Sequence, residues 1–93
     1  MNKSELIDTL ARNLGKRRTE IEKIVEATFD LIIAELSKGD SVRIVGFGNF
    51  EVRRRIAREG RNPLTGDLIQ IKATQTPFFA PGKKLKDKVK GKR

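Results

Sequence analysis

Apolar residues at helical spacing predict a first helix that starts after Asn2 and ends near Gly15. Its apolar positions are Leu6, Ile7, Leu10, Ala11 and Leu14. Asn2 is a favourable capping residue, and Glu5 stands three residues later, as in a capping box. Gly15 fits the position after the helix, where a left-handed backbone is common.

A second apolar pattern predicts a helix from Thr19 to the segment 37–39. Thr19 and Glu22 have capping-box spacing, and a start one or two residues earlier is compatible with the pattern. Its apolar positions are Ile21, Ile24, Val25, Phe29, Leu31, Ile32, Ile33 and Leu36. They cover about 200° of the helix circumference, which is wider than a single core-facing stripe.

This wide apolar surface indicates a second copy of the chain. One further helix and a short sheet cannot cover it, and no sequence remains for a third layer in a monomer. We therefore expect a symmetric homodimer in which helices of both protomers share one core. The residues expected in the dimer core are Phe29, Ile32, Leu36, Ile44, Phe47, Phe50 and Phe79.

After residue 40 the period changes to that of β-strands. Residues 41–45 alternate as a strand, residues 46–49 form a glycine-containing turn, and a second strand begins at Phe50. The phenylalanines here are interpreted as core residues. A platform on which bases stack is the alternative, but the chain has no Tyr or Trp.

Residues 51–75 are interpreted as a two-stranded β-ribbon arm with its tip at 60–66, where two glycines and an Asn-Pro step form a turn cluster. Val52 and Ile56 lie on one face of the outgoing strand and Arg53 lies on the other. Arg58 has the parity of Val52, so we expect a bulge or strong twist that turns it toward the side of Arg61.

The remaining chain returns to the body. Thr76-Pro77 is expected to end the returning strand, Phe78-Phe79 to re-enter the core, and residues 83–90 to form a short helix before a basic tail at 91–93. The predicted fold is α+β, a single domain over 1–93 that forms an intertwined homodimer. Its parts are an N-terminal helical hairpin, a small antiparallel sheet extended into the arm, and a C-terminal helix; residues 1–50 and 76–90 form the dimerisation body.

The net charge of +9 is unevenly distributed. In residues 1–50 eight cations balance eight acids, whereas residues 51–75 hold six cations and three acids. Residues 83–93 hold seven cations and one acid. A basic field confined to one part of a chain is typical of polyanion-binding proteins; a charge that served only solubility would be interspersed.

The absence of Cys and His excludes disulfides, Cys/His zinc sites and catalysis by either residue. No nucleophile–base set, Walker loop or dinucleotide fingerprint is present, so we expect no enzyme, cofactor or metal. No apolar run reaches the roughly 20 residues that span a bilayer, and the N-terminus lacks a signal-peptide core. We therefore expect a soluble intracellular protein with no membrane partner.

The ribbon arginines suit the narrow, negative minor groove of DNA, whose base code is degenerate. Alternatively, they belong to a solvated ribbon whose charge prevents edge pairing. Pro63 has a rigid ring and no N–H, so it can enter a base step as a wedge, or it can simply shape the turn. The candidate DNA-binding residues are Lys3, Arg53, Arg55, Arg58, Arg61, Asn62, Pro63, Thr65, Lys72, Gln75, Lys83 and Lys86.

Four of these candidates have further expected roles. Asn62 and Thr65 are expected to support the geometry of the tip more than to read bases. Lys83 lies at a helix N-terminus, which favours an anion such as a phosphate. For Lys3, an ion pair with a carboxylate such as Glu26, for which bound DNA would compete, is the alternative to a direct phosphate contact.

Several motifs together closely resemble the signature of the bacterial HU/IHF histone-like DNA-binding proteins. They are Gly46-Phe47-Gly48-Asn49-Phe50, then Arg55, Arg58 and Gly60, and the run Arg61-Asn62-Pro63-Leu64-Thr65-Gly66. Phe79-Ala80-Pro81-Gly82-Lys83 with Leu85-Lys86-Asp87 resembles the C-terminal motif of that family, and residues 2–6 resemble its opening. Lys72 departs from it, because the family often has an apolar residue or proline there.

The resemblance implies a homodimer whose two arms embrace duplex DNA through the minor groove, with Pro63 intercalating and bending it. Val45 is typical of the HU branch, which implies a nucleoid-associated, non-sequence-specific protein that compacts DNA and prefers bent, nicked or gapped duplexes. The alternatives are an IHF-like subunit with sequence preference and a module that binds structured RNA. Pairing with a related subunit as a heterodimer is also left open.

Overall fold

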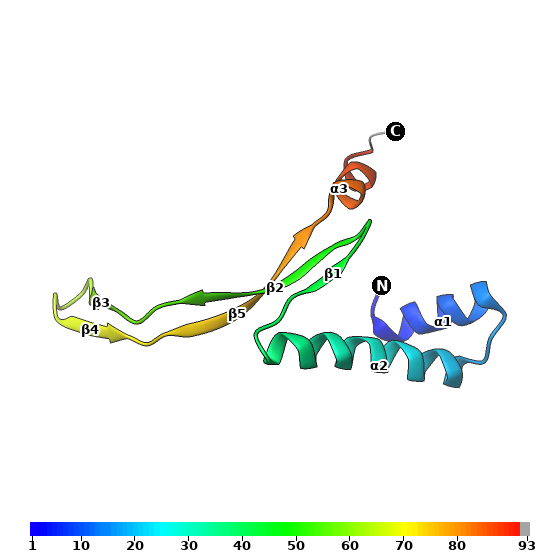
Figure 1. Cartoon of the computed structure of the whole chain (residues 1–93), viewed down its shortest axis with the longest axis horizontal. Helices are drawn as coiled ribbons and strands as arrows, with labels where there is room; N and C mark the ends of the chain where they lie inside the picture. Colours follow the sequence, from blue (N-terminus) through cyan, green and yellow to red (C-terminus); the bar gives the residue numbers. More distant parts are fainter. Residues whose placement is uncertain (92–93) are drawn as a thin grey trace. The chain divides into compact units, whose positions relative to one another are not determined.

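The computed structural model describes residues 1–91, which fall into two compact units divided after Glu35. The first unit is a helical hairpin of α1 (Lys3–Leu14) and α2 (Arg18–Ser37), whose last residues belong to the second unit. The second unit holds the strands and α3 (Lys83–Lys90) (Figure 1). Helices and strands therefore occupy the segments that the sequence predicts, and the fold is α+β.

Helix α1 has both of its expected ends. The side-chain Oδ1 of Asn2 accepts a hydrogen bond from the backbone N–H of Glu5 at 2.8 Å. Gly15 ends the helix with φ of 63°, and its N–H lies against the carbonyls of Ala11 and Arg12. The two caps confirm the predicted limits of the first helix.

Helix α2 begins at Arg18, within the one or two residues before Thr19 that the sequence pattern allows. The predicted capping role of Thr19 is wrong, because this residue lies inside the first turn. The N–H groups of Glu20 and Ile21 instead donate to the carbonyl of Arg17. The Arg18 guanidinium bonds Asp8 of α1 and Glu22 of α2, each at 2.6 Å. These bonds raise the pKa of Arg18, with the Asp8 bond as the main cause, and they link the two helices.

The core of the hairpin is small. Among the described residues only Ile7, Ile21 and Val25 are buried apolar side chains, and Leu10 and Ala11 pack against them. Much of the apolar surface of α2 remains exposed, including Leu31 with 64% of its surface accessible. The single chain therefore leaves uncovered the wide apolar face that its sequence predicts.

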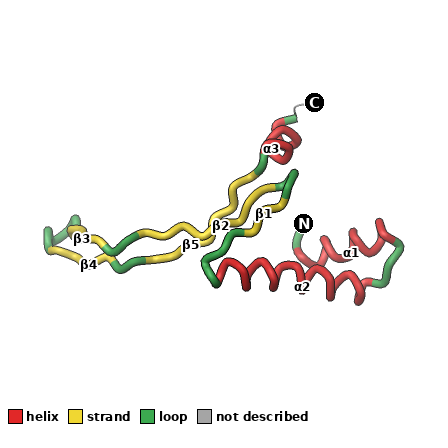
Figure 2. Tube along the Cα trace, in the orientation of Figure 1, coloured by secondary structure: helices red, strands yellow, loops and turns green. Residues whose placement is uncertain are grey.

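The second unit contains a three-stranded antiparallel sheet in the order β1–β2–β5 (Figures 1 and 2). Its strands are β1 (Val42–Ile44), β2 (Gly48–Arg55) and β5 (Thr74–Pro81). Gly48 lies so close to Phe79 that a Cβ there would fall 2.6 Å from the ring. Glycine at this position therefore permits the close contact of β2 with β5.

Strand β5 does not end at Pro77, contrary to the prediction; it continues through Phe78 and Phe79 to Pro81. It lies at the edge of the sheet, where a proline without an N–H is tolerated. Phe78 and Phe79 therefore lie on opposite faces. Phe79 packs against Phe50 and Phe47, with ring centres 4.9 and 5.2 Å apart, whereas Phe78 does not re-enter the core and is exposed.

The ribbon continues from β2 and β5 into β3 (Arg58–Arg61) and β4 (Leu68–Ile71) (Figure 2). The ladder is interrupted at residues 56–57 on one strand and 72–73 on the other. Arg55 pairs with Thr74 before the interruption, and Arg58 pairs with Ile71 after it. Equal numbers of residues are skipped, so the register is unbroken and the expected bulge is absent.

Candidate nucleic-acid interface

Two of the predicted arginines share one face at the root of the arm. Arg53 lies opposite Thr76, and Arg55 lies opposite Thr74, two residues farther along the ladder. Together with Pro77 and Phe78 they line a shallow groove. Paired guanidinium and hydroxyl groups along one face suit the oxygens of a phosphate backbone.

Arg53 also stacks on an aromatic ring. Its guanidinium carbon lies 3.4 Å from the centre of the Phe78 ring, within the range of a cation–π interaction. A guanidinium that lies flat on a ring keeps its N–H donors at the edge of the plane, available for another acceptor. The sequence does not predict this stacking, because its pattern favours a core position for Phe78.

The distal arm separates the other two arginines. Arg61 shares a face with Glu59 and Gln70, whose side chains form a 3.4 Å hydrogen bond. Arg58 lies on the opposite face with Ile71 and Ile69, since side chains alternate along β3. The structure therefore brings Arg53 and Arg55 together but does not turn Arg58 to the side of Arg61.

The turn at the tip is closed by internal hydrogen bonds. The N–H of Asn62 donates to the carbonyl of Asp67 at 2.9 Å, and the N–H of Gly66 donates to the carbonyl of Asn62 at 2.7 Å. Gly66 has φ of 75°, which favours glycine. Arg61 donates from Nη1 to the carbonyl of Gly66 at 3.1 Å. Arg61 thus braces the turn as well as carrying charge.

Asn62 and Thr65 support this turn with their side chains, as expected. Asn62 Oδ1 accepts the N–H of Leu64 at 2.9 Å, an Asx-turn, and Thr65 Oγ1 accepts the N–H of Asp67 at 3.3 Å. Pro63 is exposed, and 94% of the surface of Leu64 is accessible. The tip therefore presents two adjacent apolar side chains on a hydrogen-bonded turn.

Lys3, a candidate on the body, is paired with a carboxylate. Its Nζ lies 2.5 Å from Glu26 Oε1 of α2. The hydrogen bond with Glu26 is the main cause of the raised pKa of Lys3. Both side chains are about half exposed, so the pair is accessible to solvent and to a competing phosphate.

The remaining candidates lie on two elements of the second unit. Lys83 and Lys86 are exposed residues of the first turns of α3, which begins after Gly82. Gln75 pairs with Arg54 across the ladder, and Lys72 lies in its interruption. Of the predicted basic tail, Gly91 ends α3 with φ of 79°, and residues 92–93 lie outside the described residues.

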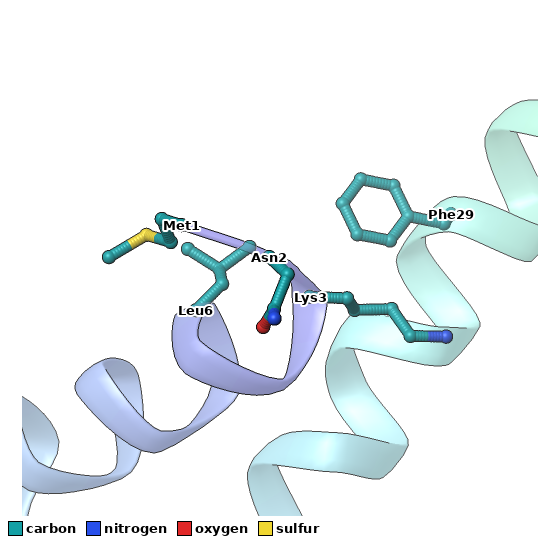
Figure 3. A pocket seen from close by; sticks show the side chains of 5 residues that line it. All are labelled: Met1, Asn2, Lys3, Leu6 and Phe29. Atoms are coloured by element: carbon teal, nitrogen blue, oxygen red, sulfur yellow. The ribbon is translucent and has the colours of Figure 1, made fainter.

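Several of the predicted dimer-core side chains are accessible in the single chain. Phe29 has 42% of its surface exposed, and Ile44 and Phe47 are also exposed, while the remaining members are half-buried: Ile32, Leu36, Phe50 and Phe79. Phe29, Met1 and Leu6 border a hollow of about 370 Å³, together with Asn2 and Lys3 (Figure 3). An apolar hollow of this kind is a surface that a second protein chain can fill.

Within residues 1–91, no group of three or more acidic residues could hold a metal ion. None of the helices within the same range is long and apolar enough to cross a membrane.

Comparison with known proteins gives one consistent result. Residues 1–90 match the family model described as "Bacterial DNA-binding protein". The chain is 53% identical to "DNA-binding protein HU" of Geobacillus stearothermophilus over 90 residues, covering 97% of this chain and all of the relative. It is 50% identical to "DNA-binding protein HU 1" of Bacillus subtilis (strain 168) over 92 residues, covering 99% of this chain and all of that relative.

Solved structures agree. The chain is similar to HU in an Anabaena HU–DNA cocrystal structure, with a TM-score of 0.82, 44% identity and coverage of 96% of this chain and 97% of that chain. It is also similar to HU from Thermotoga maritima, with a TM-score of 0.68, 35% identity and coverage of 96% and 98%.

Proposed function

The chain belongs to the bacterial DNA-binding protein family that includes HU, and from this membership we propose that it is a non-sequence-specific architectural protein that bends and compacts duplex DNA. The HU-type proteins of this family are architectural DNA-binding proteins and not enzymes, and neither is this chain. In this proposal the chain holds DNA through the minor groove, with a β-arm whose tip is a wedge.

One observation carries the proposal: a basic ribbon ends in a rigid turn with Pro63 exposed at its tip. Arg53 and Arg55 line the root on one face, and Arg61 stands directly behind the turn. Arginine in a narrow minor groove gives affinity with little base information, and an apolar wedge at a base step bends the duplex. A single ribbon that carries both the arginines and the Pro63 wedge suits a protein that bends DNA without reading its sequence.

The proposed active form is a homodimer. Phe29 and Phe47 are too exposed in one chain to be complete core residues, and the hollow beside Met1 has mainly apolar walls. A second copy that covers these surfaces supplies a second arm. Two arms grip the duplex from both sides, and Lys83 and Lys86 then contact phosphates of the bent flanks.

In the cell this activity places the protein on the bacterial chromosome, in the nucleoid. Strained and interrupted duplexes are the preferred partners, because a nick or gap lowers the cost of unstacking a base step. The relatives named HU support this branch of the family over an IHF-like subunit with sequence preference.

A gel-shift series on straight, nicked and gapped duplexes, at several salt concentrations, tests the proposal. We expect tighter binding to nicked and gapped DNA, little difference between unrelated sequences, and affinity that falls steeply with salt. Duplex RNA of equal length serves as competitor. Preference for RNA would favour the RNA-binding alternative, and strong selection of one sequence would favour the IHF-like alternative.

Energy transfer between dyes at the two duplex ends tests the wedge. Pro63→Ala should reduce bending more than it reduces affinity, because the arginines that provide charge remain. An unchanged bend would remove Pro63 from its proposed role while leaving DNA binding intact.

A further inference from the structure

Leu64 lies beside Pro63 at the end of the arm and packs little against the rest of the chain. With 94% of its surface exposed, it is among the most exposed large apolar residues of the described chain. A single exposed leucine is ordinary on a protein surface. This one stands at the outermost turn of an element proposed to enter DNA, so its position requires an explanation.

We propose that Leu64 is a second wedge residue, which enters the base step or lies on the groove floor together with Pro63. The inference rests on the proposed function and adds a second DNA-contacting side chain to the proposed wedge. Leucine is among the side chains that minor-groove proteins insert between base pairs. Pro63 and Leu64 together present a broader apolar surface to the bases than a single proline ring does.

The hydrogen bonds of the turn allow both residues to leave water. Pro63 has no N–H, and the N–H of Leu64 already donates to Asn62 Oδ1 at 2.9 Å. Burying a polar group without a partner is unfavourable, because it gives up its hydrogen bonds to water. The two residues at the front of the turn therefore bring no unsatisfied backbone donor into the base stack.

The same bonds hold the two side chains in place. The Asn62–Asp67 closure and the bond from Gly66 to the Asn62 carbonyl fix both ends of the turn. Arg61 also stabilises the turn, because its guanidinium donates a hydrogen bond to the Gly66 carbonyl. A preorganised turn loses little conformational entropy on insertion.

Charge around the turn selects DNA as the occupant. Arg61 directly precedes the turn, and Arg58 begins the same strand. An exposed apolar tip beside cations matches a base step, which carries phosphates on both sides. The occupant is therefore a base step of duplex DNA.

Leu64→Ser tests the inference, measured as end-to-end energy transfer at saturating protein and as affinity for an intact duplex. Serine suits turns, so folding should be unaffected. We expect transfer to fall toward the value of free DNA. Affinity should fall by about tenfold, because two tips each bury less apolar surface against the bases. Leu64→Met, which keeps an apolar chain of similar size, should retain wild-type bending.

Leu68→Ser is the matched control, since Leu68 is 63% exposed on the same ribbon but lies outside the turn. It should bend DNA as the wild type does; equal loss of bending in both serine variants would overturn a specific role for Leu64. Normal bending by Leu64→Ser with impaired Pro63→Ala would show that proline alone is the wedge. Normal bending by both variants would instead overturn the wedge of the proposed function.

Discussion

Arg53 and Phe78 form a stacked pair at the root of the arm, with the guanidinium carbon 3.4 Å from the ring centre. The two residues belong to neighbouring strands and are offset by two positions, because Arg53 is opposite Thr76. An arginine on an exposed strand otherwise samples many rotamers. The ring restricts this freedom and holds the cation over the groove that Arg55 also lines.

Phe78→Leu should weaken DNA binding about two- to fivefold, since a cation–π contact at an exposed site contributes about 0.5–1 kcal/mol. The measurement is a double-mutant cycle with Arg53→Gln, using affinity for a nicked duplex. Phe78 acts through Arg53, so its substitution should have almost no effect once Arg53 is replaced. If the two substitutions instead reduced affinity additively, Phe78 would not act by positioning Arg53 and would contact DNA itself.

Asn62→Ala should disrupt the tip without unfolding the body. It removes the acceptor of the Leu64 N–H, so hydrogen exchange at Leu64 should accelerate and DNA bending should fall. Thr65→Ala is the comparison, because it removes a longer hydrogen bond of 3.3 Å and should have a smaller effect. Equal effects of the two substitutions would show that the Asn62 hydrogen bond is no more important to the tip than that of Thr65.

Local signals in the sequence are sufficient to predict the two ends of α1 and the tip. Asn2, Gly15 and the Asn62–Gly66 run each act through neighbours in the chain, and the structure confirms their roles. Pro77 suggests a strand end only because the rule against proline applies to central strands. It lies in an edge strand, and which strand is at the edge depends on pairing that no local pattern contains.

Contacts across the ribbon depend on its register, and for that reason the sequence pattern does not predict them. The hydrogen bond between Asn62 and Asp67 sets the register of the two strands. Followed from the tip to the root without a bulge, this register places Arg53 opposite Thr76 and Phe78 on the same face as Arg53. The expected bulge at Arg58 is incompatible with this alignment. The sequence pattern does not predict the ion pair of Arg18 with Asp8 either, because this pair depends on how α1 packs on α2.

Phe29→Ser should weaken the proposed dimer far more than an isolated chain. Phe29 is 42% exposed in one chain, whereas truncation of a fully buried phenylalanine costs about 3–5 kcal/mol. Sedimentation equilibrium should show dissociation at concentrations where the wild type is dimeric, and the melting temperature at those concentrations should be lower than that of the wild type. Leu68→Ser, an exposed apolar residue of the arm, should leave assembly unchanged. A monomeric wild type would remove the dimer from the proposal.

Arg55→Ala should reduce the affinity for unrelated sequences equally and flatten the salt dependence. The slope of log K against log salt should change by about 0.9 for each phosphate that the variant no longer neutralises. Arg55 is a clearer test than Arg61, whose guanidinium also braces the turn. Arg12→Ala removes the same charge from the last turn of α1, which holds no candidate DNA-binding residue, and should leave the slope unchanged. A loss of affinity confined to one sequence would indicate direct base readout instead.

Lys3 and Glu26 should have opposite effects on DNA binding. In the free protein the Lys3 ammonium is held by Glu26 at 2.5 Å, so a phosphate must displace the carboxylate before it can bind the lysine. Lys3→Gln should therefore weaken binding, whereas Glu26→Gln frees the cation and should strengthen it. Affinity on one duplex at constant salt is the measurement. Equal weakening by both substitutions would show that the ion pair acts only in folding.

The pH dependence of stability provides a second test of the same pair. The folded pKa of Lys3 is raised above its ordinary value of 10.5, mainly by the hydrogen bond with Glu26. The stabilising contribution is thus complete below pH 10.5 and is lost as pH rises through the raised pKa. Between neutral pH and a pH above 10.5, the free energy of unfolding of the wild type should fall more than that of Glu26→Gln, as measured by urea unfolding. The ion pair would thus be intact at neutral pH, where bound DNA would compete with Glu26 for Lys3.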